Sequence, residues 1–145
     1  MPSSPPGLMT ITIGESEQIA EGAIAKAKEL GINISIAICD AGGRLMLFNR
    51  MEEAVWASAQ TAQGKALTSA GFNMSSGRFT PEAGVGHLRL FGPQADSLDM
   101  IYIKGAAAIF RDNLAIGSCG VAGGTTEQDE TCARAGILKV APPSK

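Results

Sequence analysis

Apolar residues recur along the first third of the chain with two different periods. Over residues 15–30 they recur at helical spacing, and a glycine follows directly, which is typical of a helix that ends in a left-handed cap. Residues 33–39 alternate apolar and polar side chains, which predicts a strand, and residues 44–51 form a second run of strand length. Asp40-Ala41-Gly42-Gly43 between them has the composition of a tight turn. We therefore predict a helix followed by an antiparallel hairpin.

The rest of the chain predicts a second helix, three strands and a closing helix. Residues 54–70 are rich in alanine, serine and threonine, which predicts a helix that can pack very close either to a sheet or to a symmetry mate. Residues 71–96 form a long irregular segment, and such segments are usually functional or mobile. We expect a three-stranded meander at residues 99–103, 106–110 and 114–121, and a helix at residues 126–139. This order predicts an α+β domain in which helices pack on a five-stranded antiparallel sheet.

Length and composition fit one domain. The chain has 145 residues, of which 45% are hydrophobic and 18% charged. We expect the domain to cover residues 10–140, between an N-terminal tail of residues 1–9, with Met9 as an alternative start, and a C-terminal tail of residues 141–145. The net charge of -2 and the aromatic content of 5% argue against a nucleic-acid partner. No apolar run approaches the roughly 20 residues that span a bilayer, so no membrane partner is expected.

The cysteines indicate a reducing compartment. Cys39, Cys119 and Cys132 are odd in number and lack the CxxC spacing of redox and zinc motifs. The start of the chain also lacks the basic and apolar regions of a secretory signal. We therefore expect a cytoplasmic protein with buried, free thiols.

Residues 114–136 combine a strand of small side chains, a glycine turn and a helix start. The glycines at 123 and 124 allow the chain to turn, and Thr125 or Thr126 can then cap the helix. This pattern describes either a well-capped helix or a ligand rim of amides, hydroxyls and carboxylates. The candidate contacts are Gly123, Gly124, Thr125, Thr126, Gln128, Asp129 and Glu130.

Two cations and one imidazole are further candidates. Arg50 ends the second predicted strand, and Lys65 stands between small residues of the second helix. Each is either an exposed charge or a clamp for a carboxylate or oxyanion. His87 is the only histidine and falls in the irregular segment, where it is either incidental or a ligand.

Four segments of the chain stand in a characteristic order. They are Asp40-Ala41-Gly42-Gly43-Arg44-Leu45 with Arg50-Met51, then Gln63-Gly64-Lys65-Ala66, then residues 116–121, and finally residues 123–130. Together they resemble the GlcG/HbpS-type haem-binding family, also called the haem-degrading domain family, which includes the C-terminal domain of PduO-type cobalamin adenosyltransferases. The resemblance implies a profilin-like fold, self-association as a dimer that can build into an octamer, and haem or a corrinoid as cofactor. Where the family usually carries Gly-Gly-x-Pro, this chain has residues 103–108, and Lys104 replaces one glycine.

Three functions remain open. A tetrapyrrole-binding protein needs an axial metal ligand, for which His87 is the candidate, and cations for acidic groups of the ligand. The candidate cations are Arg50, Lys65, Arg78 and Lys104. Further candidate contacts of such a ligand are Asp40, Met51 and Phe79.

The second function is a cofactor-free lyase, hydratase or isomerase that acts on a small carbonyl or carboxylate compound. Arg50 or Lys65 would hold the developing anion, and Tyr102 would donate a proton. The candidates for the base are Asp129, Glu130 and His87. The third function is an oligomeric accessory protein without a ligand.

Overall fold

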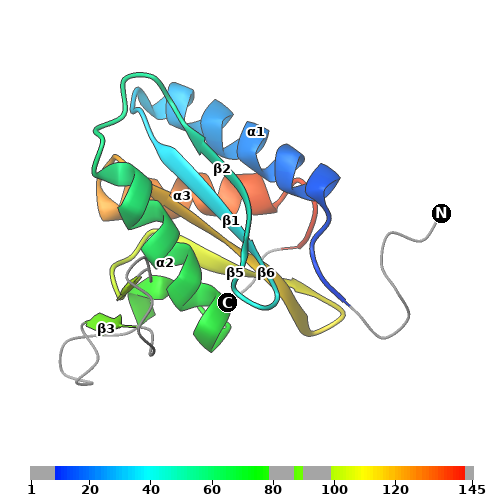
Figure 1. Cartoon of the computed structure of the whole chain (residues 1–145). Coiled ribbons are helices and arrows are strands. Elements are labelled where there is room, and N and C mark those ends of the chain that lie inside the picture. Colours follow the sequence, from blue (N-terminus) through cyan, green and yellow to red (C-terminus); the bar gives the residue numbers. More distant parts are fainter. Residues whose placement is uncertain (1–8, 79–86, 90–98, 143–145) are drawn as a thin grey trace.

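The computed structural model describes residues 9–78, 87–89 and 99–142. The elements follow in the order α1 (Ile13–Leu30), β1 (Ser35–Asp40), β2 (Leu45–Arg50), α2 (Ser58–Phe72), a short 3-10 helix (Ser76–Arg78), β3 (His87–Arg89), β4 (Asp99–Ile101), β5 (Ala106–Arg111), β6 (Leu114–Ala122) and α3 (Thr126–Ile137). The predicted α+β class and the antiparallel sheet are confirmed (Figure 1). None of the described helices is long and apolar enough to cross a membrane.

The main sheet has the strand order β2-β1-β6-β5, with every pair antiparallel. The β1–β2 pair is the predicted hairpin, in which Ser35 lies opposite Arg50. Ser35 also lies opposite Ala122 of β6. One end of the sheet therefore brings together the end of β2, the start of β1 and the glycine turn that follows β6.

The predicted five-strand count is wrong for the main sheet. Within the described residues this sheet has four strands, because β4 pairs with β3 in a separate ribbon instead of joining β5. The hydroxyl of Thr68 in α2 donates to the carbonyl of Ile101 at 3.0 Å, so β4 is held against the helix. The second helix also begins later than predicted, at Ser58, and leaves Val55 and Trp56 in an exposed turn.

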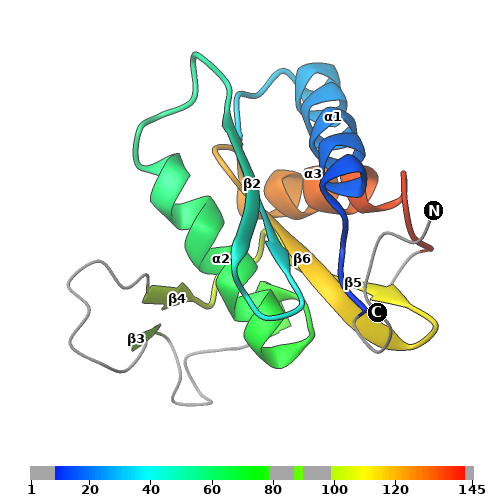
Figure 2. The ribbon, with the colours of Figure 1, turned by 45° about the vertical axis from the view of Figure 1, so that its right-hand side comes forward.

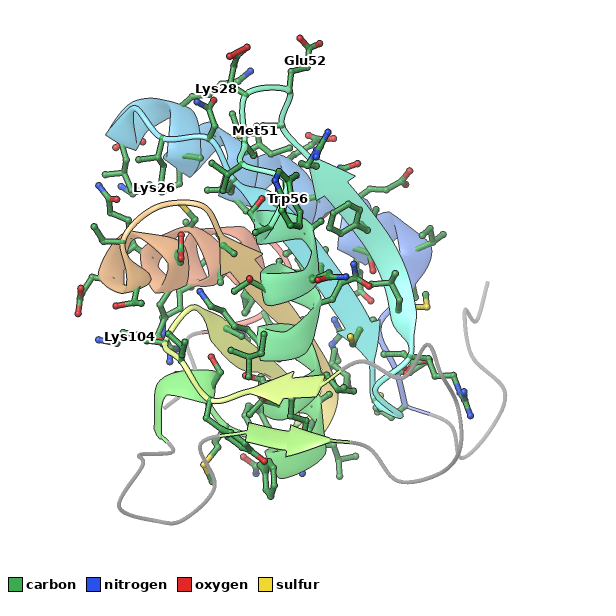
Figure 3. All side chains as sticks on the ribbon, turned by 60° about the vertical axis from the view of Figure 1, so that its left-hand side comes forward. Lys26, Lys28, Met51, Glu52, Trp56 and Lys104 are labelled. Carbon is green, nitrogen blue, oxygen red and sulfur yellow. The ribbon has the colours of Figure 1, made fainter. Side chains whose placement is uncertain are left out.

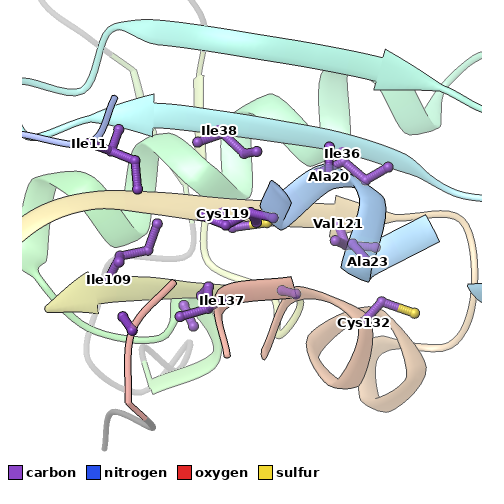
Figure 4. Close-up of a cluster of buried hydrophobic side chains, with 14 of the residues drawn as sticks. Ile11, Ala20, Ala23, Ile36, Ile38, Ile109, Cys119, Val121, Cys132 and Ile137 are labelled. Atoms are coloured by element: carbon purple, nitrogen blue, oxygen red, sulfur yellow. The ribbon is translucent and has the colours of Figure 1, made fainter. Parts of the chain in front are cut away.

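Helices cover both faces of the sheet, with α1 and α3 on one face and α2 on the other (Figure 2). The core beneath α1 and α3 is built from large apolar side chains that the period-two strands direct to that face (Figure 4). They include Ile36, Ile38, Ile109, Cys119 and Val121.

The opposite face is alanine-rich, and α2 packs very close to it. Ala37 and Ala122 of the sheet contact Ala62 and Ala66 of α2 in a small buried cluster. A Cβ placed on Gly120 would collide with the carbonyl of Ala62, so only glycine permits this approach. The small side chains of residues 54–70 therefore serve close packing of α2 on the sheet, which is one of the two arrangements that the sequence allowed.

Candidate functional site

A buried ion pair links α2 to the start of α3. The Lys65 ammonium donates to Asp129 Oδ2 at 3.1 Å and to the carbonyl of Val121 at 3.1 Å. The other carboxylate oxygen of Asp129 accepts the amide proton of Gly124 at 2.8 Å. Both side chains are only 3% exposed, and they are the only buried charged side chains among the described residues. The charges are compensated, as burial requires.

Local sequence explains how the ion pair is buried. The residues that share a face of α2 with Lys65, three and four positions away, are small: Thr61, Ala62, Thr68 and Ser69. No bulky neighbour on the helix therefore competes with the lysine for space. Gly105, in the loop before β5, lies over the ammonium with φ +144. A Cβ at Gly105 would be 2.5 Å from Lys65 Nζ, so a side chain there would displace the lysine.

This ion pair lies at the floor of an open cleft of about 310 Å³, which we call the Lys65 cleft. Its walls come from the turn before α2, the first turns of α2, the β4–β5 loop and the turn after β6. The lining residues are Val55, Ala57, Ser58, Thr61, Lys65, Ile103, Ala122, Gly123, Gly124, Thr126 and Asp129. Val55 and Ile103 are 65% and 49% exposed, so the mouth is apolar while the floor is charged.

A larger open groove of about 740 Å³ lies between the β1–β2 turn and the second half of α2, and we call it the hairpin groove. Its lining is Ala41, Gly42, Gly43, Arg44, Leu45, Leu67, Ala70, Gly71 and Met100. A Cβ on Gly43 would lie 3.4 Å from Leu67 Cδ1, which shows how closely the turn approaches the helix. Among the lining residues that the structure describes, Arg44 is the one that carries a charge, and its side chain is exposed.

Met100 lies at the β4 side of the hairpin groove. Its sulfur accepts the Tyr102 hydroxyl proton at 3.8 Å, and burial raises the pKa of that hydroxyl. Leu88 of β3 lies opposite Met100 across the ribbon, and His87 lies opposite Ile101. The backbone of the only histidine therefore runs beside the strand that carries Met100. The His87 side chain is outside the described part of the structure, as are the Arg78 side chain and all of Phe79.

The predicted site residues separate into groups. Lys65, Asp129, Gly123, Gly124 and Thr126 are brought together in the Lys65 cleft. Among the predicted residues that the structure describes, Arg50 and Lys104 are exposed and line neither cleft. Figure 3 shows Trp56 at the start of α2 and Lys104 on the loop that leads to β5.

Three of the predicted contact residues, Asp40, Thr125 and Gln128, make hydrogen bonds to residues that are close to them in the chain. Asp40 Oδ1 accepts the amide protons of Gly42 at 2.9 Å and Arg44 at 3.0 Å, which closes the β1–β2 turn. Thr125 and Gln128 form the predicted capping box of α3, with bonds of 3.1 and 2.9 Å.

Two further predicted residues hold separate elements together. The Met51 sulfur accepts the Ile34 amide proton at 3.3 Å. Glu130 accepts the Ser75 hydroxyl proton at 2.6 Å and pairs with Arg134 at 3.1 Å. Within the described residues, no three histidine, cysteine, aspartate or glutamate side chains form a metal-binding group.

The hairpin groove was missed by the residue-level predictions. Arg44 belongs to a segment that carries the family resemblance, yet no pattern in the sequence indicates that it shares a groove with Leu67 and Met100. These residues come from three distant elements, and only the packing of the hairpin turn and β4 against α2 makes them neighbours.

The comparisons with known proteins identify the family. The family model described as haem degrading protein HbpS-like matches residues 11–138. This chain is a member of the HbpS-like family. The matched region therefore includes the whole main sheet and all three α-helices, and only the two ends of the chain lie outside it.

Relatives of this HbpS-like chain include two proteins of Citrobacter freundii. An uncharacterised 15.0 kDa protein of the dhaT-dhaS intergenic region is 29% identical over 90% of this chain and 92% of its own length. The corrinoid adenosyltransferase PduO is 28% identical over 91% of this chain, which spans 39% of the PduO length. Among solved structures, a complex of PduOC with haem has a TM-score of 0.74 at 22% identity and covers 90% of this chain and 95% of its own, which shows a shared fold.

Proposed function

We propose that this HbpS-like protein binds a tetrapyrrole, haem or a corrinoid, in the hairpin groove. The observation that carries the proposal is the size and lining of that groove. Its volume of about 740 Å³ lies in the upper part of the range for cofactor sites, roughly 300–1,000 Å³. The Lys65 cleft, at about 310 Å³, lies at the lower limit and suits a much smaller molecule.

The chemistry of the groove lining also fits a tetrapyrrole. Leu45, Leu67 and Ala70 present apolar atoms to the face of a macrocycle, and burying that face stabilises the complex. Arg44 is exposed at the rim, where its guanidinium can pair with an acidic side chain of the ligand that stays in water. His87 and the Met100 thioether are the proposed axial-ligand candidates, since both residue types bind haem iron.

The comparisons support the same ligand class. The family model describes haem-degrading proteins, a relative is a corrinoid adenosyltransferase, and a protein of the same fold forms a complex with haem. Haem and corrinoid share a tetrapyrrole macrocycle with acidic or amide side chains. The proposal is therefore made for this ligand class, with the metal centre to be decided by experiment.

Titration with hemin tests the proposal. We expect saturable binding with a shifted Soret band in the wild type. Ala70→Trp fills the groove from α2 and should weaken binding by at least about tenfold. Gln60→Trp is the matched control, because Gln60 is exposed on the same helix and lines neither cleft, and it should bind hemin as the wild type does.

Two further variants assign the contacts. Arg44→Glu should weaken hemin binding by reversing the charge at the rim, while His87→Ala should change the spectrum of the bound hemin if the imidazole is axial. A wild type that binds neither hemin nor hydroxocobalamin, or an Ala70→Trp protein that binds hemin unchanged, would exclude the hairpin groove as a tetrapyrrole site.

A further inference from the structure

We infer that the Lys65 cleft is a second and separate binding site, for a small uncharged molecule with one carbonyl oxygen and a short apolar body. The inference does not depend on the tetrapyrrole proposal, because the two clefts have no lining residue in common. It rests on a hydrogen-bond count at Lys65, on the charges beside it, and on the lining of the cleft.

The hydrogen-bond count leaves one donor of Lys65 for a ligand. An ammonium has three protons to donate. Among the described residues, its acceptors are the carbonyl of Val121 and the carboxylate of Asp129. Lys65 also lines the cleft, and its side chain is 97% buried by the protein around it. A ligand oxygen in the cleft would supply the third acceptor to a donor that is already fixed in place.

The charges favour an uncharged ligand over an anion. Lys65 is neutralised by Asp129, so the floor of the cleft carries no net charge from side chains. A carboxylate bound there would lie next to the Asp129 carboxylate, and the two like charges would repel each other. A carbonyl oxygen accepts the lysine proton without adding a charge.

The hydroxyl protons of the rest of the lining already have acceptors within the protein, and Thr126 Oγ1 contacts Glu127 Oε2 at 3.4 Å. The Ser58 hydroxyl donates to the carbonyl of Val55 at 2.6 Å, and the Thr61 hydroxyl donates to the carbonyl of Ala57 at 3.0 Å. The remaining walls include the apolar side chains of Ile103 and Ala122. A ligand that is polar at one end and apolar at the other therefore matches this site.

Nitrogen-15 NMR with 2-butanone as the probe tests the site. We expect saturable shifts of the amide signals of Gly105, Gly123 and Gly124 in the wild type. Butyrate, which has the same length and one negative charge, should bind at least about tenfold more weakly. Equal binding of butyrate, or shifts that do not saturate with 2-butanone, would overturn the inference.

Variants separate this site from the hairpin groove. Thr61→Trp fills the cleft without changing the ion pair, and Lys65→Met/Asp129→Asn replaces the pair by neutral side chains of similar shape. Both should lose the 2-butanone response, whereas Gln60→Trp and Ala70→Trp should keep it. Retention of the response in a folded Thr61→Trp protein would refute the assignment, even if the double variant did not fold. Thr61→Trp should still bind hemin, so the two proposals can fail independently.

Discussion

At the scale of single residues, Lys65 is a buried charge whose surroundings fix its position. Its charge is compensated by Asp129, and its position is fixed by the carbonyl of Val121 and by the bare backbone of Gly105. A buried ion pair costs desolvation on both sides, so its net contribution to stability is small. The cost of losing one partner is large, because an unpaired charge remains buried.

This asymmetry predicts the stability of Lys65 variants. Lys65→Met should lower the free energy of unfolding by about 3–5 kcal/mol, because Asp129 stays buried without a cation. Lys65→Met/Asp129→Asn should recover a large part of that loss. Urea unfolding measures both, with Lys26→Met as control, since the exposed Lys26–Glu29 pair should contribute less than about 0.5 kcal/mol. A double variant no more stable than the single one would contradict this account.

At the scale of elements, the start of α1 is tied to the far edge of the sheet. The Thr12 hydroxyl caps the helix by accepting the amide proton of Glu15. In turn, the Glu15 carboxylate accepts the amide proton of Thr12 at 3.0 Å. The same carboxylate pairs with Arg111 at the end of β5. Burial by itself raises the pKa of Glu15, but the Thr12 amide and Arg111 outweigh it, and the pKa is lowered from 4.5.

A lowered pKa in the folded state gives stability that acid removes. The Glu15 contribution should be complete above the ordinary pKa of 4.5 and should disappear as the pH falls through the lower, folded-state value. Glu15→Gln should therefore be less stable than the wild type near neutral pH, and the difference should shrink in acid. Thermal unfolding at several pH values measures this. Glu17→Gln, at an exposed position of the same helix, should follow the wild-type profile.

At the scale of the whole molecule, the cysteines report on the integrity of the core. Cys39, Cys119 and Cys132 are all buried and free, as the sequence predicted. Burial raises the pKa of Cys39 and of Cys132 to about 11, and it raises that of Cys119 as well. The thiolate is the reactive form, so native thiols should be nearly inert near neutral pH.

Thiol titration measures this property. At about pH 8, native protein should react with Ellman's reagent at least roughly a hundredfold more slowly than a free thiol, and urea should release all three thiols together. Rapid modification of one thiol in native protein would show that the core opens locally at that cysteine.

Self-association remains a prediction. The exposed side chains of Val55, Trp56 and Ile103 beside the Lys65 cleft form the surface on which it should first be examined.

The structural features that could be predicted from the sequence depend on residues close together in the chain. The periods of residues 15–30 and 33–39, the turn at 40–43 and the Thr125 capping box arise from interactions within a few residues, so the chain itself specified them. The small side chains of residues 54–70 also indicated that α2 packs closely, either on a sheet or on a symmetry mate. The resemblance to the HbpS-like family, confirmed over residues 11–138, was carried by short segments of this kind.

Tertiary structure alone decided the partners of these elements. Residues 99–101 have the composition of a strand in either sheet, and their contact with α2 assigned them to the ribbon. A lysine between small residues is ordinarily exposed, and only the approach of Gly105 and Asp129 from distant segments buried Lys65. Both clefts exist for the same physical reason: their walls come from elements far apart in the chain, whose spacing depends on packing across the sheet.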